Sequence, residues 1–284
     1  MHYIKQYNLF HSDSPIVVDL TETDKDGSLI RAIHKKLFKV CRDRGDWCWA
    51  DQPFVKDDPI IQSFYKPQIP TSRYKWLATG DIDRVINQYA KLFPNFRYLG
   101  AVPLDFDQLR GYQLSSEDYC MHYNRDGKTK IGGVFNLDTH DKAGSHWVSM
   151  FCDLEHNYIA FFDSVGVKTP PKEIGILMEN IKRQIERCMD HKLKKYLVNR
   201  PMKFTVNQKN IQKGNSECGV FCIYFILKCL LGEKPEDIFG DPNLNDNSVN
   251  YFRTKVFRPS IYSDNSLFKM QKYPLFTGRR WRER

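Results

Sequence analysis

The sequence predicts an α+β fold, in which short strands form one sheet and helices pack against it. Short apolar runs rich in β-branched and aromatic residues stand between turn residues in the middle of the chain. Stretches with apolar residues at helical spacing come before and after these runs. The strands are followed by helices, without the regular strand–helix–strand alternation of a parallel α/β sheet. With 284 residues, 41% of them hydrophobic, the chain can bury a sizeable core.

The N-terminal quarter of the chain differs from the rest. One helix is predicted over residues 28–41, where apolar residues recur at helical spacing. Turn segments that contain proline follow it up to residue 70. We therefore expect two domains, an N-terminal helical arm over residues 1–75 and a core over residues 76–284.

In the core, the first helix is expected to begin near Thr79 and to end before Pro94. Three strands are predicted from short apolar runs, at residues 133–137, 147–154 and 158–162. Residues 153–157, four of them polar, form the expected hairpin turn between the last two. A long amphipathic helix, a short strand and an apolar helix follow, at residues 174–196, at residues 204–207 and in the run that opens at Cys218.

Composition and charge limit the class of protein. No apolar stretch approaches the roughly 18 residues that a membrane span needs. The first residues lack the apolar segment of a secretory signal, so we expect a soluble intracellular protein. The net charge of +9 favours either contact with nucleic acid or another acidic partner, or a solvated basic face with a basic tail.

Eight cysteines are scattered along the chain without a CxxC pair. This pattern predicts free thiols in a reducing compartment. The paired spacing of a structural zinc site is missing. We therefore expect neither a metal nor an organic cofactor.

Cys218 stands where polar residues give way to the apolar helical run. The unpaired N–H groups and the dipole at a helix N-terminus favour a thiolate over a thiol. A thiolate is the nucleophile of a cysteine protease. The alternative is structural, because a single cysteine at a helix start is commonly a small buried residue.

Three further residues complete a candidate catalytic set. His146 precedes one predicted strand and Asp163 ends the next, so both are expected at one edge of the sheet. His146 would pair with the Cys218 thiolate and protonate the leaving amine, and Asp163 would orient the imidazole. Gln212, six residues before Cys218, would share an oxyanion hole with the Cys218 backbone N–H. Taken singly, each residue also fits a structural role, such as a turn at Asp163.

The same residues and their neighbours carry a family resemblance. Their order along the chain is His146-Trp147, then Asp163, Gln212 and Cys218-Gly219. This order resembles the adenain-like and ubiquitin-like-protein cysteine protease superfamily, which includes the SUMO-deconjugating proteases and the adenovirus maturation protease. The resemblance covers about residues 74–258. It implies a papain-like α+β core with a central mixed sheet flanked by helices.

Three stretches are similar to the branch of large DNA viruses that contains the African swine fever virus polyprotein protease. They are residues 132–148, 216–219 and 252–258. The expected N-terminal arm also matches that protease in size and position. Asp163 departs from the swine fever enzyme, which has Asn there, and agrees with the SUMO proteases. Either residue type can orient His146, so the resemblance implies an active thiol peptidase.

The superfamily cuts after Gly-Gly, which implies that Trp147 walls a narrow tunnel for the two glycines. Trp76 is the expected second wall, because Trp76-Leu77 looks like the helix entry of the SUMO proteases. Here residues 78–80 intervene before the acidic residue of that motif. Two facing indoles would admit only residues without side chains and would exclude bulkier sequences sterically. The structural alternative for Trp147 is packing in the core.

The residues and the resemblance together imply a cysteine endopeptidase that cleaves viral structural precursors after Gly-Gly, within Gly-Gly-Xaa, during virion maturation. Its expected location is the host cytoplasm and the virion. One alternative is an isopeptidase that removes SUMO or another ubiquitin-like modifier. A second, without enzymatic activity, is a protease-like scaffold or nucleic-acid-binding module with weak affinity through its basic surface.

Overall fold

The computed structural model describes residues 76–188 and 202–258 and, before them, residues 8–9, 13, 35–36, 41, 48, 51–55, 62 and 65–70. The chain divides into two compact units. Unit 1 comprises Met1–Thr71 with Phe257–Asn265, and unit 2 comprises Ser72–Val256 with Ser266–Arg284. Most of the helix predicted over residues 28–41 lies outside the described residues.

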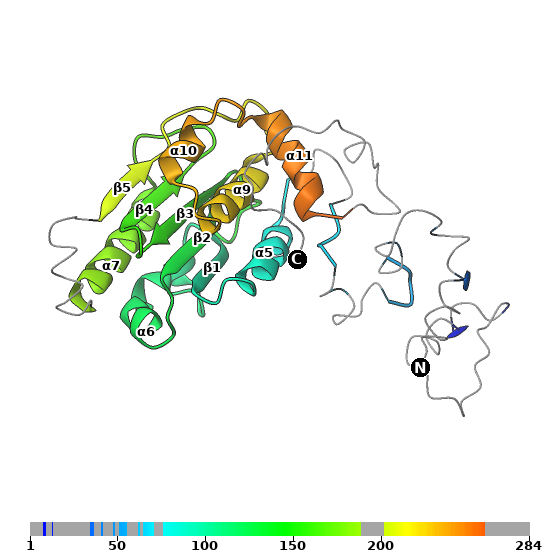
Figure 1. Ribbon diagram of the computed structural model, residues 1–284, viewed down its shortest axis with the longest axis horizontal. Coiled ribbons are helices and arrows are strands. Elements are labelled where there is room, and N and C mark those ends of the chain that lie inside the picture. Colours follow the sequence, from blue (N-terminus) through cyan, green and yellow to red (C-terminus); the bar gives the residue numbers. More distant parts are fainter. Residues whose placement is uncertain are drawn as a thin grey trace. The chain divides into compact units, whose positions relative to one another are not determined.

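Unit 2 is built on a five-stranded mixed sheet whose strands stand side by side in chain order (Figure 1). The strands are β1 (Phe96–Pro103), β2 (Lys130–Asn136), β3 (Trp147–Asp153), β4 (Tyr158–Phe162) and β5 (Lys203–Val206). The two outer pairs, β1–β2 and β4–β5, are parallel. The two inner pairs, β2–β3 and β3–β4, are antiparallel. The predicted α+β fold with a central mixed sheet is confirmed.

The hairpin between β3 and β4 forms where the polar residues predict it. Oδ1 of Asp153 accepts hydrogen bonds from the backbone N–H groups of Glu155 (3.0 Å) and His156 (3.1 Å). Asn157 has a φ of 56°, a left-handed conformation that asparagine tolerates better than most residues. Short polar side chains therefore decide the turn.

β3 and β5 differ from the prediction by one residue at their ends, and two other strands differ more because polar or small residues interrupt their apolar pattern. The sequence analysis did not predict β1, whose run is broken by Arg97 and by Gly100 at a φ of 97°. β2 begins three residues before the predicted start, at the buried Lys130. The ammonium of Lys130 lies 3.7 Å from the Asp153 carboxylate on the neighbouring strand. This ion pair lets a lysine occupy a buried strand position.

Helices cover both faces of the sheet. They are α5 (Thr79–Ala90), α6 (Tyr119–Asn124), α7 (Lys172–Cys188), α9 (Cys218–Leu230), α10 (Pro235–Gly240) and α11 (Asp246–Val256), with short 3-10 helices η2 (Phe106–Gln108) and η3 (Leu114–Ser116). α7 begins two residues before the predicted start, and residues 189–196 of that prediction lie outside the described residues.

The alternation along β3 separates two apolar layers. Val148 and Met150 belong to the core cluster that includes Leu177 and Met178 of α7. On the other face lies α9, which packs against β3 and is buried along its whole length. There the ring of Phe162 stacks on α9, at the end of β4. The sheet therefore holds α9, and with it Cys218, in a fixed position.

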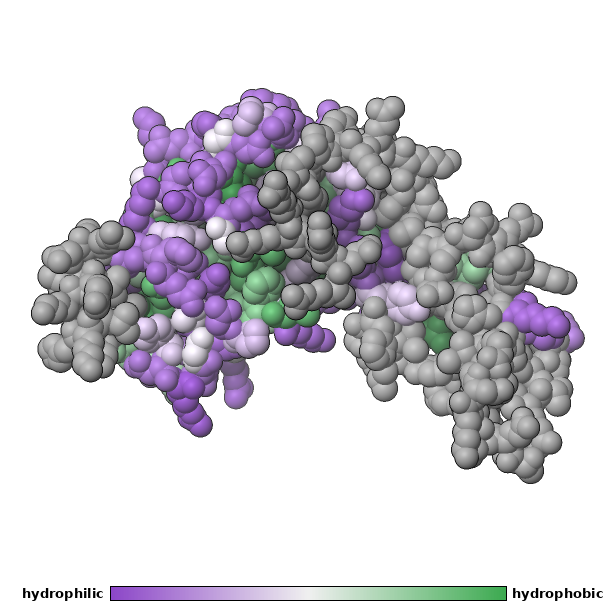
Figure 2. All heavy atoms as spheres, in the orientation of Figure 1, coloured by the Kyte–Doolittle hydropathy of each residue, from purple (hydrophilic) through white to green (hydrophobic). Residues whose placement is uncertain are grey.

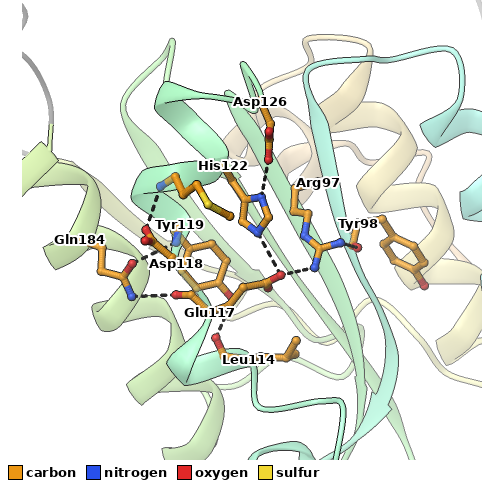
Figure 3. A network of polar contacts seen from close by, with 10 residues as sticks. Arg97, Tyr98, Leu114, Glu117, Asp118, Tyr119, His122, Asp126 and Gln184 are labelled. Carbon is orange, nitrogen blue, oxygen red and sulfur yellow. Dashed lines mark hydrogen bonds and ion pairs between the residues drawn. The ribbon is translucent and has the colours of Figure 1, made fainter.

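A polar network attaches α6 to β1 and α7 (Figure 3). The carboxylate of Glu117 accepts a hydrogen bond from the Arg97 guanidinium, and its Oε1 lies 3.1 Å from Nε2 of His122. The Gln184 side chain of α7 donates to the backbone carbonyl of Glu117 and accepts from the N–H of Tyr119, each at 3.0 Å. Within unit 2, these contacts hold α6 at the end away from α11, as the two labels show (Figure 1).

In unit 1, Cys41 and Cys48 form a disulfide with their Cα atoms 5.6 Å apart. The expectation that all cysteines are free thiols is therefore wrong for this pair. The fold brings these two residues within the distance that a disulfide spans, although their spacing lacks a CxxC pattern. Arg258 is buried in the same unit, and its guanidinium donates to Asp51 and Gln62, each at 2.8 Å.

Hydrophilic side chains cover α10 and the loops beside it, with hydrophobic residues visible deeper between them (Figure 2). Among the described residues, no helix combines the length and the hydropathy of a membrane-spanning segment. The apolar residues of the described helices instead contribute to the two layers on the sheet.

Candidate active site

Cys218 is the first residue of α9, as the sequence predicts. Its side chain is 1% exposed. Gly219 lets the helix start lie close to the segment before α5, because an added Cβ would lie only 3.1 Å from Cβ of Leu77. At this position the thiol meets the unpaired N–H groups and the positive end of the helix dipole, which favour the thiolate.

The loop between β2 and β3 positions His146. Oδ1 of the buried Asn136 accepts hydrogen bonds from the backbone N–H groups of Asp138 (2.9 Å) and Ser145 (3.2 Å). The N–H of Leu137 donates to the carbonyl of His146 at 2.9 Å. Both ends of the loop are therefore attached to the end of β2, and His146 enters β3 from a fixed position.

His146 and Asp163 meet at one edge of the sheet. Because β3 and β4 are antiparallel, the residue before β3 and the residue after β4 lie close together. Nε2 of His146 lies 2.7 Å from Oδ1 of Asp163, which also accepts the N–H of Val165 at 3.0 Å. The His146 and Asp163 side chains are 18% and 4% exposed, so their hydrogen bond is largely shielded from water.

Cys218 also acts on the ionisation of His146. Burial lowers the pKa of His146, but the Asp163 carboxylate and the Cys218 thiol outweigh burial and raise the pKa from 6.5 to about 9. The imidazole is thus stabilised in its protonated form. This arrangement suits an imidazolium–thiolate pair.

Asn207 holds the backbone of Asp163 in place. The sequence analysis did not single out this residue. Its Nδ2 donates to the backbone carbonyl of Asp163 at 2.6 Å and to that of Lys209 at 3.0 Å. Asn207 is fully buried and directly follows β5. β5 runs parallel to β4, so polar residues after both strands reach the same edge. A polar residue directly after a predicted strand is therefore the sequence signal that could have indicated Asn207.

Ser164 fixes the side chain of Gln212. The hydroxyl of Ser164 donates to Oε1 of Gln212 at 2.7 Å, and Nε2 of Gln212 donates to the carbonyl of Gly214 at 2.9 Å. The backbone N–H of Gln212 donates to the carbonyl of Ser164 at 2.9 Å. The amide nitrogen of Gln212 is thereby directed toward the loop that leads to Cys218.

Trp76 and Trp147 line one cavity of about 480 Å³, beside the His146 loop. Trp147 is nearly buried, and its Nε1 donates to the carbonyl of Leu77 at 2.8 Å. Trp76 is 38% exposed. His140 and Lys142 line the same cavity from the loop between β2 and β3. The two indoles that the sequence analysis singled out thus share one cavity.

One group of three potential metal ligands occurs among the described residues, formed by Asp153, Glu155 and His156 within 4.8 Å of one another. Asp153 already accepts the two backbone N–H groups that form the hairpin, and its Oδ2 lies 3.0 Å from Nδ1 of His156. These contacts account for the group as part of the turn, and we assign no metal to it.

Comparison with known proteins relates this geometry to a family. The model of the Ulp1 protease family, C-terminal catalytic domain, matches residues 134–264, a range that includes both His146 and Cys218. A protein of Acanthamoeba polyphaga mimivirus, named a thiol protease, is 30% identical over 262 residues, which are 86% of this chain and 82% of that protein. This chain belongs to the Ulp1 protease family. It is a cysteine peptidase, as the sequence predicts.

Two crystal structures of the African swine fever virus protease share the fold of this peptidase. Both are 21% identical in sequence. One covers 87% of this chain and 97% of its own with a TM-score of 0.61. The selenomethionine form covers 84% and 94% with a TM-score of 0.63. The papain-like core that the resemblance implies is therefore the observed fold.

Proposed function

We propose that this peptidase cleaves protein chains after Gly-Gly, with Cys218 as the nucleophile. The observation that carries the proposal is the hydrogen bond between His146 and Asp163, together with the effect of Cys218 on the ionisation of His146. In this proposal residues 76–284 form the catalytic core and residues 1–75 an N-terminal arm.

The proposed cleavage reaction follows from the protonation states of His146 and Cys218. The Cys218 thiolate attacks the carbonyl carbon of the scissile bond, and the imidazolium of His146 gives its proton to the leaving amine. The resulting thioester is hydrolysed when His146, now neutral, removes a proton from water. Asp163 accepts a hydrogen bond from Nε2 of His146 throughout and keeps the other ring nitrogen directed at sulfur.

Gln212 is the proposed second donor of the oxyanion hole, beside the backbone N–H of Cys218. Its Nε2 carries two hydrogens, and the bond to Gly214 uses one of them. The hydroxyl of Ser164 fixes Oε1 and so prevents rotation of the amide. A donor fixed before substrate arrives stabilises the developing oxyanion without reorganisation during the reaction.

The cavity lined by Trp76 and Trp147 is the proposed entry for two glycines. Steric exclusion between the indoles would then reject residues with side chains. The viral origin of the 30% identical relative supports a role in processing structural precursors during virion maturation, in the host cytoplasm. Trp147 directly follows His146 in the chain, which supports this position for the Gly-Gly segment.

The test uses purified wild-type chain, Cys218→Ala and Cys229→Ala. Each is incubated with a fluorogenic Gly-Gly-Ala peptide, with a Gly-Val-Ala peptide and with a SUMO C-terminal fluorogenic substrate. Cys229 lies on the same helix, is buried and is the matched control for loss of a thiol. We expect cleavage of the Gly-Gly peptide alone by wild type and Cys229→Ala, and none by Cys218→Ala.

Other outcomes are informative. Cleavage that persists in Cys218→Ala would remove Cys218 from the mechanism. Strong preference for the folded SUMO substrate would make the chain a deconjugating isopeptidase. Equal cleavage of both peptides would overturn the Gly-Gly specificity while leaving the nucleophile in place.

A further inference from the structure

The loop between Gln212 and Cys218 is held by one face of α11. Three polar residues of this helix, Asp246, Asn250 and Arg253, stand at intervals of four and three and therefore share a face. Each of them forms hydrogen bonds with a different part of the loop. Neither the family resemblance nor the proposed catalytic residues assign a role to this helix.

Asp246 holds the first part of the loop. Its Oδ2 accepts the backbone N–H of Lys213 at 3.0 Å and that of Gly214 at 2.8 Å. Gly214 is also the residue whose carbonyl accepts the side chain of Gln212. A carboxylate that accepts two N–H groups makes strong charge-assisted hydrogen bonds. Asp246 therefore fixes the acceptor that orients the proposed oxyanion donor.

Asn250 holds the second part of the loop through Glu217, the residue before Cys218. Nδ2 of Asn250 donates to Oε1 of Glu217 at 3.1 Å. The two oxygens of Glu217 in turn accept the N–H and the hydroxyl of Ser216, each at 3.0 Å. The loop also packs closely, since an added Cβ at Gly214 would lie 2.5 Å from Oε2 of Glu217.

Arg253 holds the end of the loop and contributes a positive charge. Its side chain is fully buried, and Nη2 donates to the carbonyl of Ser216 at 3.2 Å. Burial lowers the pKa of Arg253 to about 10, and the negative charges of Glu217, Cys218 and Asp81 oppose this effect. The guanidinium is therefore charged at neutral pH, and a buried cation near a thiol favours the thiolate.

We propose that Asp246, Asn250 and Arg253 are positioning residues for the reaction, and that Arg253 also stabilises the Cys218 thiolate. This inference rests on the proposed role of Cys218. α11 acts through the loop: it fixes the distance between the Gln212 amide and the Cys218 N–H, and it supplies a second cation in addition to His146.

Several charged or titratable groups act on Cys218 from different elements. They are His146 at the start of β3, Arg253 of α11 and Cys222 of α9. Glu217, the residue before α9, acts on Arg253. Arg253 and His146 are the two cations of this set, so removal of either should raise the pH at which Cys218 ionises.

The first test measures the rate of Cys218 alkylation by iodoacetamide between pH 4 and pH 10, by mass spectrometry of the Cys218 peptide. The variants are wild type, Arg253→Met and Arg253→Lys, with folding checked by circular dichroism. The thiolate displaces iodide, so the midpoint of the rate reports the ionisation of Cys218. We expect Arg253→Met to raise the midpoint by about one unit or more, and Arg253→Lys to restore most of the shift.

An unchanged midpoint in folded Arg253→Met would overturn the electrostatic role of Arg253 and leave the role of Cys218 intact. A midpoint of about 8.5 in wild type, the value of a free thiol, would overturn this inference together with the nucleophile assignment.

The second test does not depend on the folding of a variant at a fully buried residue. Asp246 is partly exposed, and its exposed neighbour Asn247 is the matched control. We expect Asp246→Ala to lower kcat on the Gly-Gly peptide by roughly tenfold to 100-fold at nearly unchanged KM. Asp246→Asn, which keeps an acceptor for the N–H groups, should restore most of kcat, and Asn247→Ala should match wild type.

A raised KM with unchanged kcat in Asp246→Ala would show that the loop contributes to substrate binding and not to the oxyanion geometry, and would overturn the positioning role. Equal losses in Asp246→Asn and Asp246→Ala would overturn it as well, since the hydrogen bonds to Lys213 and Gly214 would then not be the cause.

Discussion

The side chain of Asn207 donates a 2.6 Å hydrogen bond to the backbone carbonyl of Asp163. This bond joins the loop after β5 to the end of β4 and fixes the backbone that carries the carboxylate. The same loop continues to Gln212. One buried amide therefore links two of the residues proposed to act in catalysis.

Replacement of Asn207 by Ala should reduce both stability and activity. It removes the Asn207 donor from the carbonyls of Asp163 and Lys209, and it removes the acceptor of the Lys209 N–H, which together cost about 3 kcal/mol of unfolding free energy. Urea denaturation measures this loss, and peptide hydrolysis measures the activity. Asn210→Ala, at an exposed position of the same loop, is the control and should leave both unchanged. Wild-type stability in Asn207→Ala would show that water replaces these bonds.

Replacement of Asp163 separates its charge from its hydrogen bond. Asp163→Asn keeps an oxygen that accepts from Nε2 of His146, so kcat/KM should fall by only about tenfold. Asp163→Ala removes the acceptor, and we expect a loss of about 100-fold or more. The pKa of His146 should fall in both variants, because Asp163 is one of the groups that raise it. Equal activity in the two variants would show that the hydrogen bond contributes nothing once the charge is removed.

The stability of the fold should depend on pH through His146. Its pKa is about 9 in the folded chain and 6.5 when unperturbed. A raised pKa in the folded state stabilises the fold fully below pH 6.5, and this contribution is lost as pH rises through 9. At about 1.4 kcal/mol per pKa unit, the decline amounts to roughly 3 kcal/mol.

Urea denaturation between pH 6 and pH 9.5 measures this decline, with His146→Gln as the comparison. The variant lacks the titrating group, so its stability should decline less over this range. Parallel curves for the two proteins would assign the pH dependence to other groups.

A side chain at Gly219 should be tightly packed. A Cβ would lie 3.1 Å from Cβ of Leu77 and 3.4 Å from Cδ1 of Ile82, so in Gly219→Ala these neighbours must move by a few tenths of an ångström. We expect a loss of about 1–3 kcal/mol in thermal or urea unfolding. Gly240→Ala is the control, because nothing lies within 4 Å of its added Cβ. Unchanged stability and activity in Gly219→Ala would show that α9 and the Leu77 segment can separate at no cost.

The sequence alone determined the elements whose apolar pattern is regular and bounded by polar residues. β4 was predicted at its observed bounds, and α9 was predicted to open at Cys218. Alternation and helical periodicity are local properties, so they are readable without the fold. The closeness of His146 and Asp163 was also predictable, because antiparallel neighbouring strands bring their ends to one edge of the sheet.

Only the tertiary structure decided the rest. β1 was missed because Arg97 and Gly100 interrupt its pattern, and the Cys41–Cys48 disulfide was missed because no spacing rule indicates it. The roles of Asn207 and Arg253 likewise come from contacts over 44 and 37 residues of sequence. A buried polar side chain is stable only beside its partner, and that partner is chosen by the packing of distant elements. Local periodicity therefore specified the framework, while long-range hydrogen bonding specified what supports the site.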